Sequence, residues 1–317
     1  MLSTPWSRSF GLRVPIVNAP MGGVAGGRLA AAVTAAGGLG MVGMGSDGSR
    51  ALLAIQLRQV RGRFGIGLVD WVIRSEAGLL EDALAARPAL LSVSFGTDLS
   101  WVAKAHEAGI ATATQVYDSV GACQAVDAGV DVLVARGSEG GGHGEVKLGT
   151  LPLLDTVLDA VSVPVLAGGG VASARSLAAV LAAGASGAWV GTRLAACPEA
   201  LTGDGSRRAL IAARATDTAV TRVFDVAKGL PWPARFPSRV LANDFVARWT
   251  GHEDVLDPPA CEELAAPIAA DDRRRRSPHR PRRCRRGCRD DPRRRVGREV
   301  IAQMCTGAEG LLAGWGS

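Results

Sequence analysis

Residues 163–194 read VPVLAGGGVASARSLAAVLAAGASGAWVGTRL. A short apolar run ends in three glycines, an alanine-rich amphipathic segment follows, and a second apolar run ends in Gly-Thr. Ser173 is placed to cap the middle segment as a helix, and Gly184 can end that helix in the left-handed conformation. The order strand, helix, strand is typical of a parallel βαβ unit.

The same unit recurs from residue 14 to about residue 197, so we predict an α/β fold with eight strands, each followed by a helix. Eight units favour a closed (β/α)8 TIM barrel over the alternative, an open doubly wound sheet. The predicted strands are 14–20, 39–44, 64–69, 89–95, 110–116, 131–136, 163–168 and 186–191. The predicted helices are 26–36, 49–61, 76–86, 98–108, 118–128, 150–161, 173–183 and one that starts after 192.

The rest of the chain divides into two further segments after the barrel at 1–198. Residues 199–260 are polar and rich in proline, with a helix predicted at 241–250, and we interpret them as a small cap over the barrel mouth. Residues 261–317 form an Arg-rich tail. Within it, 273–298 hold 14 Arg and two Asp, a charge of +12, which leaves −6 for the remainder of a chain whose net charge is +6.

The tail allows three interpretations. Its composition is that of a disordered segment, and clustered arginines can bind nucleic-acid phosphates through charge alone. Arg, Pro and Cys rise together and then vanish, however, which favours an out-of-frame stretch of GC-rich coding sequence. A zinc site made by His279, Cys284, Cys288 and Cys305 is disfavoured because the Cys-x3-Cys spacing is loose, so no metal is expected.

The composition excludes membrane and secreted classes. No apolar run reaches 18 residues, the length of a membrane span. The first residues lack the apolar centre of a signal peptide. We therefore expect a cytoplasmic protein with free thiols and no membrane partner.

Candidate site residues follow the predicted strands, at the end of the barrel where active sites lie. Gly169 and Gly170 follow the seventh strand, and Gly191 and Thr192 follow the eighth, so backbone N–H groups there could hold a phosphate. Tight turns alone would also explain these glycines. Ala19, Pro20 and Met21 end the first strand as a flat wall, and Gln115 ends the fifth with an amide that could contact a heterocycle. Each has a plainer interpretation, as core or as a solvated strand end.

His143 lies in the stretch SEGGGHGE, residues 138–145, after the sixth strand. An imidazole can act as base or acid near neutral pH. A histidine among glycines is often an ordinary surface residue, but its place after a barrel strand favours a catalytic role. His106 and His252 have no such context.

Four segments together resemble the nitronate monooxygenases, formerly called 2-nitropropane dioxygenases. They are PIVNAPMGGVAGGRLAAAVTAAGGLGMVG (15–43), VLVARGSEGGGHGE (132–145), residues 163–194 quoted above, and TDTAVTRVFDVAKGLPWP (216–233). The resemblance implies a barrel that binds FMN non-covalently, with His143 as the catalytic base. It also implies a flavin site made by Ala19, Pro20, Met21, Gln115 and Gly142, with the phosphate at Gly169, Gly170, Gly191 and Thr192.

Two departures from the family pattern concern the flavin. The family often has Asn in a strand-three motif F-G-x-N, where this chain has Gly67. A glycine–glutamine segment usually closes over the flavin near the C-terminus, where this chain has the arginine tract.

The resemblance implies oxidation of a small nitronate by O2 to a carbonyl compound and nitrite. An NAD(P)H-dependent FMN reductase of the quinone or enoyl-ACP type is the alternative, because the superfamily shares these motifs. A nucleic-acid-binding protein that uses the arginine tract is a third, disfavoured reading. Homo-oligomer formation is left open.

Overall fold

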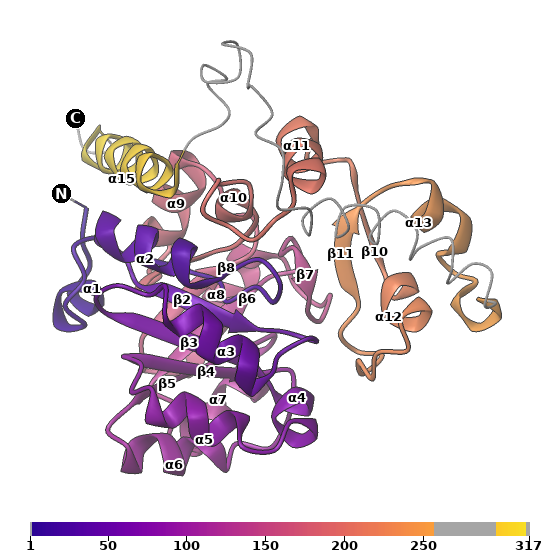
Figure 1. Ribbon diagram of the computed structural model, residues 1–317. Helices are drawn as coiled ribbons and strands as arrows, with labels where there is room; N and C mark the ends of the chain where they lie inside the picture. Colours follow the sequence, from indigo (N-terminus) through magenta and orange to yellow (C-terminus); the bar gives the residue numbers. More distant parts are fainter. Residues whose placement is uncertain (1, 257–295, 315–317) are drawn as a thin grey trace, which may run out of the picture.

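The computed structural model describes residues 2–256 and 296–314. Eight parallel strands form one sheet in the order β1-β9-β8-β6-β5-β4-β3-β2, with helices packed around them (Figure 1). Each predicted apolar run contains one of these strands, so the (β/α)8 barrel is confirmed. The strands are β1 (Ile16–Asn18), β2 (Gly40–Met44), β3 (Phe64–Val69), β4 (Leu90–Ser94), β5 (Ala111–Val116), β6 (Val132–Arg136), β8 (Val165–Gly168) and β9 (Gly187–Val190).

The helices around the sheet follow the predicted pattern, with one addition, because two helices rather than one follow β3. Ser173 accepts a hydrogen bond from the Ser176 N–H at the start of α9, and Gly184 beyond its end has φ +99°, as predicted. Asp118 caps α7 through the Gly121 N–H. The helices are α2 (Gly27–Ala36), α3 (Arg50–Leu57), α4 (Asp70–Ser75), α5 (Leu79–Ala85), α6 (Trp101–Glu107), α7 (Ser119–Asp127), α8 (Thr150–Ala160), α9 (Ala174–Ala182) and α10 (Thr192–Ala195).

A buried side chain closes the barrel between β1 and β2, the two ends of the sheet order. The Met41 N–H donates to Asn18 Oδ1 at 2.7 Å, and Asn18 Nδ2 donates to the Met41 carbonyl at 2.9 Å. One backbone bridge joins Val17 to Leu39. The Asn18 amide thus replaces a ladder pair where the strands are too short to pair fully.

The strands separate two apolar clusters. Ile16, Leu133 and Ala135 belong to the larger cluster between strands and helices, whereas Val132 and Val134 belong to a smaller one inside the barrel. Side chains along a strand alternate between its faces, so the inward row of β6 continues to the strand's last residue, Arg136. By the same alternation Gln115 lies on the inner face with Ala113, a member of the inner cluster.

Helix α1 (Pro5–Ser9) closes the opposite, N-terminal end of the barrel. Trp6 lies in the inner cluster and stacks on Phe10, with ring centroids 5.3 Å apart. Thr4 and Ser7 form a reciprocal capping box at the start of this helix. Apolar side chains therefore fill this end of the barrel.

The segment 199–256, called the cap segment or cap below, forms a small sheet with part of the glycine-rich loop. The strands β10 (Thr218–Thr221), β11 (Ser238–Leu241) and β7 (Gly142–His143) pair antiparallel in that order. This sheet ties the cap to the loop after β6, beside the barrel (Figure 1). The other elements are α11 (Asp204–Ala212), α12 (Val223–Ala227), α13 (Asp244–Trp249) and the 3-10 turn Glu253–Val255.

Helix α15 (Gly297–Ala313) lies in the part of the tail where the arginines end and an amphipathic pattern returns. It packs against α9 and α2 (Figure 1) and buries an apolar face that includes Val300, Ile301 and Met304. The Gly297 N–H at its start donates to the Glu199 carboxylate. The rest of the tail, including most of the arginine tract and the cysteines at 284 and 288, lies outside the described residues.

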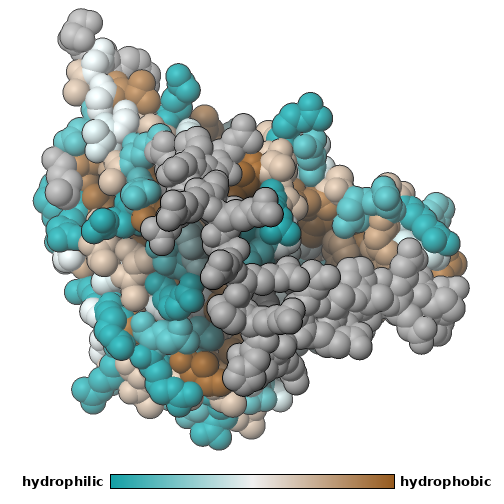
Figure 2. Space-filling model, turned by 45° about the horizontal axis from the view of Figure 1, so that its top comes forward, coloured by the Kyte–Doolittle hydropathy of each residue, from teal (hydrophilic) through white to brown (hydrophobic). Residues whose placement is uncertain are grey.

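On the part of the face in Figure 2 that is not grey, hydrophilic and hydrophobic side chains are mixed. Large hydrophobic side chains that are exposed include Val120, Val146, Leu151 and Leu311. Among the described residues, none of the helices combines the length and the apolar character that crossing a membrane requires.

Candidate active site

Arg136 organises the glycine-rich loop that follows β6. Its guanidinium Nη2 donates to the backbone carbonyls of Gly140, Gly141 and Gly142 at 2.8, 3.1 and 3.0 Å. The residue is buried, and this burial lowers the pKa of Arg136 from its usual value, although a guanidinium stays charged near neutral pH. A single buried cation therefore holds the loop in a tight curve immediately before His143.

The same guanidinium explains two of the glycines. A Cβ on Gly144 would lie 2.1 Å from Arg136 Nη1, and one on Gly140 would lie 2.7 Å from Arg136 Nε. Neither position has room for a side chain while Arg136 keeps its hydrogen bonds. These glycines therefore permit the backbone to wrap closely around a buried charge.

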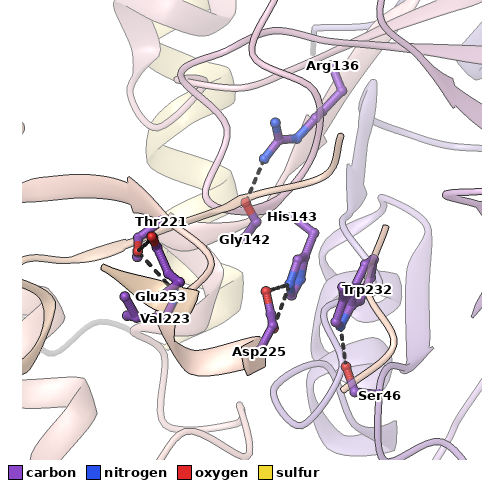
Figure 3. Close-up of polar contacts among 9 residues, drawn as sticks. All are labelled: Ser46, Arg136, Gly142, His143, Thr221, Val223, Asp225, Trp232 and Glu253. Atoms are coloured by element: carbon purple, nitrogen blue, oxygen red, sulfur yellow. Dashed lines mark hydrogen bonds and ion pairs between the residues drawn. The ribbon is translucent and has the colours of Figure 1, made fainter. Parts of the chain in front are cut away.

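His143 leaves this loop in β7, opposite Ser238 of β11. Its Nε2 lies 3.0 Å from both carboxylate oxygens of Asp225, a residue of α12 in the cap (Figure 3). The side chain of His143 is 19% exposed and that of Asp225 is 8% exposed. The pair is thus largely shielded from water, where a charged hydrogen bond is stronger than at the surface.

A polar contact at the end of β10 positions Asp225. Thr221 Oγ1 accepts a hydrogen bond from the N–H of Val223, the first residue of α12, and contacts Glu253 Oε1 at 3.3 Å (Figure 3). Thr221 is buried. This contact fixes the start of the short helix, and Asp225 follows two residues later.

Trp232 stacks on one face of the imidazole. The rings of His143 and Trp232 stack with centroids 3.6 Å apart and planes inclined by 6°. Trp232 Nε1 donates to Ser46 Oγ at 2.9 Å, which ties the cap to the loop after β2 (Figure 3). The indole also makes edge contacts with Trp71 and Phe95, so His143 stacks on one member of an aromatic cluster.

The residues predicted after β1 and β9 lie together at the C-terminal end of the strands. The Cβ position of Gly191 is 3.7 Å from Ala19 Cβ and 3.6 Å from Met21 Sδ. The Cβ position of Gly141 is 2.8 Å from Thr192 Oγ1. The loop after β9 thus lies between the first-strand loop and the glycine-rich loop.

Pro20 lies against β3 in this assembly. A Cβ on Gly67 would be 2.1 Å from Pro20 Cγ. The position where the family often has Asn is therefore occupied by the proline ring. The first-strand loop can pack against β3 in this way because residue 67 has no side chain.

Gly169 and Gly170 follow β8, with φ +105° and +67°. They border a pocket of about 310 Å³ that Glu139, Thr150 and Ser176 also line. Gly142 lies in β7, with its carbonyl bound by Arg136. The Gln115 side chain is half-buried, and Tyr117 OH lies 3.5 Å from its Oε1.

Three residues of the site were not identified from the sequence: Arg136, Asp225 and Trp232. Arg136 had a usable signal, because it is a charged residue at the end of a buried strand. Asp225 and Trp232 lie in the segment 216–233, which resembles the family, but nothing in that segment indicated their contacts with His143, because those contacts span more than 80 residues. In the described residues, no group of three or more His, Cys, Asp or Glu side chains could hold a metal ion.

Comparison with known proteins identifies a family that this chain matches over most of its length. The family described as "Nitronate monooxygenase" matches residues 4–64 and 75–277. A nitronate monooxygenase of Paraburkholderia phytofirmans is 30% identical over 311 residues, which cover 83% of this chain and 81% of that protein.

A second relative and a solved structure are also similar to this chain. The (3aS,4S,5R,7aS)-5-hydroxy-7a-methyl-1-oxo-octahydro-1H-indene-4-carboxyl-CoA dehydrogenase of Rhodococcus jostii is 31% identical over 263 residues, 77% of this chain and 67% of that protein. The structure of nitroalkane oxidase from Streptomyces ansochromogenes superposes with a TM-score of 0.73 at 25% identity, over 97% of this chain and 99% of that one.

Proposed function

Because the chain belongs to the nitronate monooxygenase family and is an oxidoreductase, we propose that it binds FMN and oxidises alkyl nitronates with O2. The products would be a carbonyl compound and nitrite. The observation that carries this proposal is the placement of His143 at the barrel mouth, between Asp225 and Trp232.

The loops after β8 and β9 fit the phosphate of FMN. The backbone N–H groups of Gly170, Gly191 and Thr192 donate to no other residue within the described parts of the chain. Such N–H groups on adjacent loops are suitable donors to a phosphate. Gly169 completes this loop pair, since β8 and β9 are neighbours in the sheet.

Ala19, Pro20, Met21, Gln115 and Gly142 would line the remainder of the flavin site. They share the C-terminal end of the barrel with the phosphate loops. When bound, FMN would supply the redox chemistry by accepting electrons from the substrate and passing them to O2. The chain itself would bind, orient and shield the reactants.

His143 would supply the acid–base chemistry. As a neutral imidazole it would remove the α-proton of a nitroalkane, and as an imidazolium it would offset the negative charge of a nitronate. The aromatic cluster of Trp71, Phe95 and Trp232 would exclude water from the same space.

A second candidate function is an NAD(P)H-dependent FMN reductase or dehydrogenase that acts on a larger substrate. The observation that favours it is the 31% identity to a dehydrogenase of a bicyclic CoA ester. Rapid bleaching of the flavin by NADH without oxygen, with none by a nitronate, would establish this candidate in place of the first.

The direct test begins with purified full-length protein. Flavin absorbance, present on purification or regained by reconstitution with FMN, and oxygen consumption with ethylnitronate are expected. A colourless protein that FMN does not reconstitute would refute the proposal. A flavoprotein inert toward nitronates would refute the substrate assignment alone.

A further inference from the structure

The two nitrogens of the His143 ring have different surroundings. Nε2 lies 3.0 Å from both oxygens of Asp225. Nδ1 has no hydrogen-bond partner among residues 2–256 and 296–314. An ionised carboxylate can only accept hydrogen bonds, so Nε2 must carry the proton in this contact.

The ring cannot exchange its nitrogens without losing this contact. A half-turn about the Cβ–Cγ bond would place the carbon Cε1 against Asp225 and leave a buried carboxylate without its donor. Stacking on Trp232 keeps the ring plane fixed, because that indole is itself held by Ser46. The arrangement therefore selects one orientation and one neutral tautomer.

Other charges near the ring are engaged elsewhere. Arg136 is bound to the loop carbonyls, and Arg239 of β11 donates to the Ser138 carbonyl. Glu145, two residues beyond His143, pairs with Lys147 and approaches Arg235. Asp225 is the carboxylate that contacts the ring itself.

We infer that Asp225 is a positioning residue that keeps the proton of neutral His143 on Nε2, so that Nδ1 exchanges the proton with the substrate. In the forward step the α-carbon–hydrogen bond breaks, its proton bonds to Nδ1, and its electron pair stays with the nitro compound as the nitronate. This inference rests on the proposed function only for the identity of the substrate. The tautomer is a property of the protein alone.

The cap is therefore part of the acid–base apparatus. Asp225 and Trp232 both belong to residues 199–260, whereas His143 belongs to the loop after β6. The short β7–β11 pairing brings the two parts together. A barrel without its cap would keep the histidine but lose the group that orients it.

The test is nitrogen-15 NMR of the histidine rings in the full-length protein, with His143→Asn used to assign the signals among the four histidines. In neutral His143 we expect a protonated Nε2 and an unprotonated Nδ1. A protonated Nδ1, or rapid averaging of the two tautomers, would overturn the inference without any other variant being made.

Two matched variants extend the test to turnover. Asp225→Asn should lose the single tautomer and lower kcat on the order of 100-fold, with a smaller change in KM, because orientation of the base is lost while substrate contacts remain. Asp244→Asn removes a carboxylate from an exposed position of the cap and should stay within about twofold of the parent. Loss of turnover in Asp225→Asn with the tautomer unchanged would contradict the inference.

The inference and the proposed function can fail separately. A single Nε2-protonated tautomer in a protein that turns over no nitronate would leave the Asp225 assignment intact and refute the substrate. Turnover of nitronates by a protein whose His143 tautomers are averaged would support the substrate and refute the Asp225 assignment.

Discussion

The guanidinium of Arg136 donates to the carbonyl of Gly142 at 3.0 Å, one residue before His143. The buried cation thus acts on the histidine through the backbone, without touching its ring. Together with Asp225 and Trp232 it positions His143 from three sides.

Replacing Arg136 by Met should loosen this loop. The change keeps an unbranched apolar stem but removes the donor to three loop carbonyls, one of them in a buried hydrogen bond, so we expect the free energy of unfolding to fall by about 1–3 kcal/mol. Amide hydrogen exchange of residues 138–144 should also accelerate. Arg61→Met, at an exposed position, should change stability by less than about 0.5 kcal/mol. Equal losses in the two variants would contradict the role of Arg136.

Gly144→Ala tests the space beside Arg136. The new Cβ would lie 2.1 Å from Nη1, and the guanidinium can retreat only by giving up its hydrogen bonds. A loss of about 1–3 kcal/mol in urea unfolding is expected. The control is Gly310→Ala in α15, where nothing lies within 4 Å and alanine should stabilise the helix by about 0.4–1 kcal/mol. Unchanged stability in Gly144→Ala would show that the guanidinium moves freely.

Gly67→Asn restores the residue that the family often has. We expect it to displace the first-strand loop, because its Cβ would lie 2.1 Å from Pro20 Cγ. If that loop lines the flavin, flavin retention after gel filtration should fall along with stability, by about 1–3 kcal/mol for the overpacking. Tighter flavin binding in this variant would show that Pro20 relocates and that Asn regains a contact.

Acid should weaken the contacts that Asp131, the residue before β6, makes with His106 and Thr112. Burial opposes ionisation of this carboxylate, but hydrogen bonds from His106 and Thr112 outweigh burial and lower the pKa of Asp131. A lowered folded pKa means that the stabilisation is complete above the unfolded value of about 3.9. It is lost as the pH falls through the folded value.

Asp131→Asn should therefore cost stability at pH 7, by less than about 1 kcal/mol because the pair is half-exposed. The difference from the parent should shrink below about pH 4. Urea titrations at pH 7 and pH 3 measure it, with the exposed Asp127→Asn as the control. A difference independent of pH would exclude ionisation as its origin.

His143→Ala tests the proposed base. Turnover of a neutral nitroalkane should fall on the order of 100-fold or more, while flavin absorbance is retained. His252→Ala, a cap histidine that is exposed, should leave turnover unchanged. Equal turnover of His143→Ala and the parent would remove His143 from the mechanism.

Much of the fold could be predicted because its signals are local. Each strand is a short apolar run, and each helix begins or ends at a residue such as Ser173 or Gly184, whose preferences act within a few positions. The eightfold repetition then favoured closure into a barrel. Closure itself depends on Asn18, whose buried amide pairs with Met41 across a gap that no periodicity reveals.

The candidate site was predictable only where it follows the barrel's geometry. Loops after parallel strands meet at one end, so Gly169, Gly191 and His143 were expected there from their positions alone. The cap carries no such rule. Asp225 and Trp232 lie close to His143 because β7 pairs with β11. Strand β7 has two residues, which is too short to show a pattern in the sequence.

The sequence by itself determined the strand and helix order, the end of the barrel that carries the loops, and the presence of an ionisable ring there. These follow from hydrophobic periodicity and from chain direction. Only the tertiary structure decided which nitrogen of His143 contacts Asp225 and why its loop is rich in glycine. Both depend on contacts between residues distant in the chain: Asp225 at Nε2, and the Arg136 guanidinium in the space where side chains at 140 and 144 would stand.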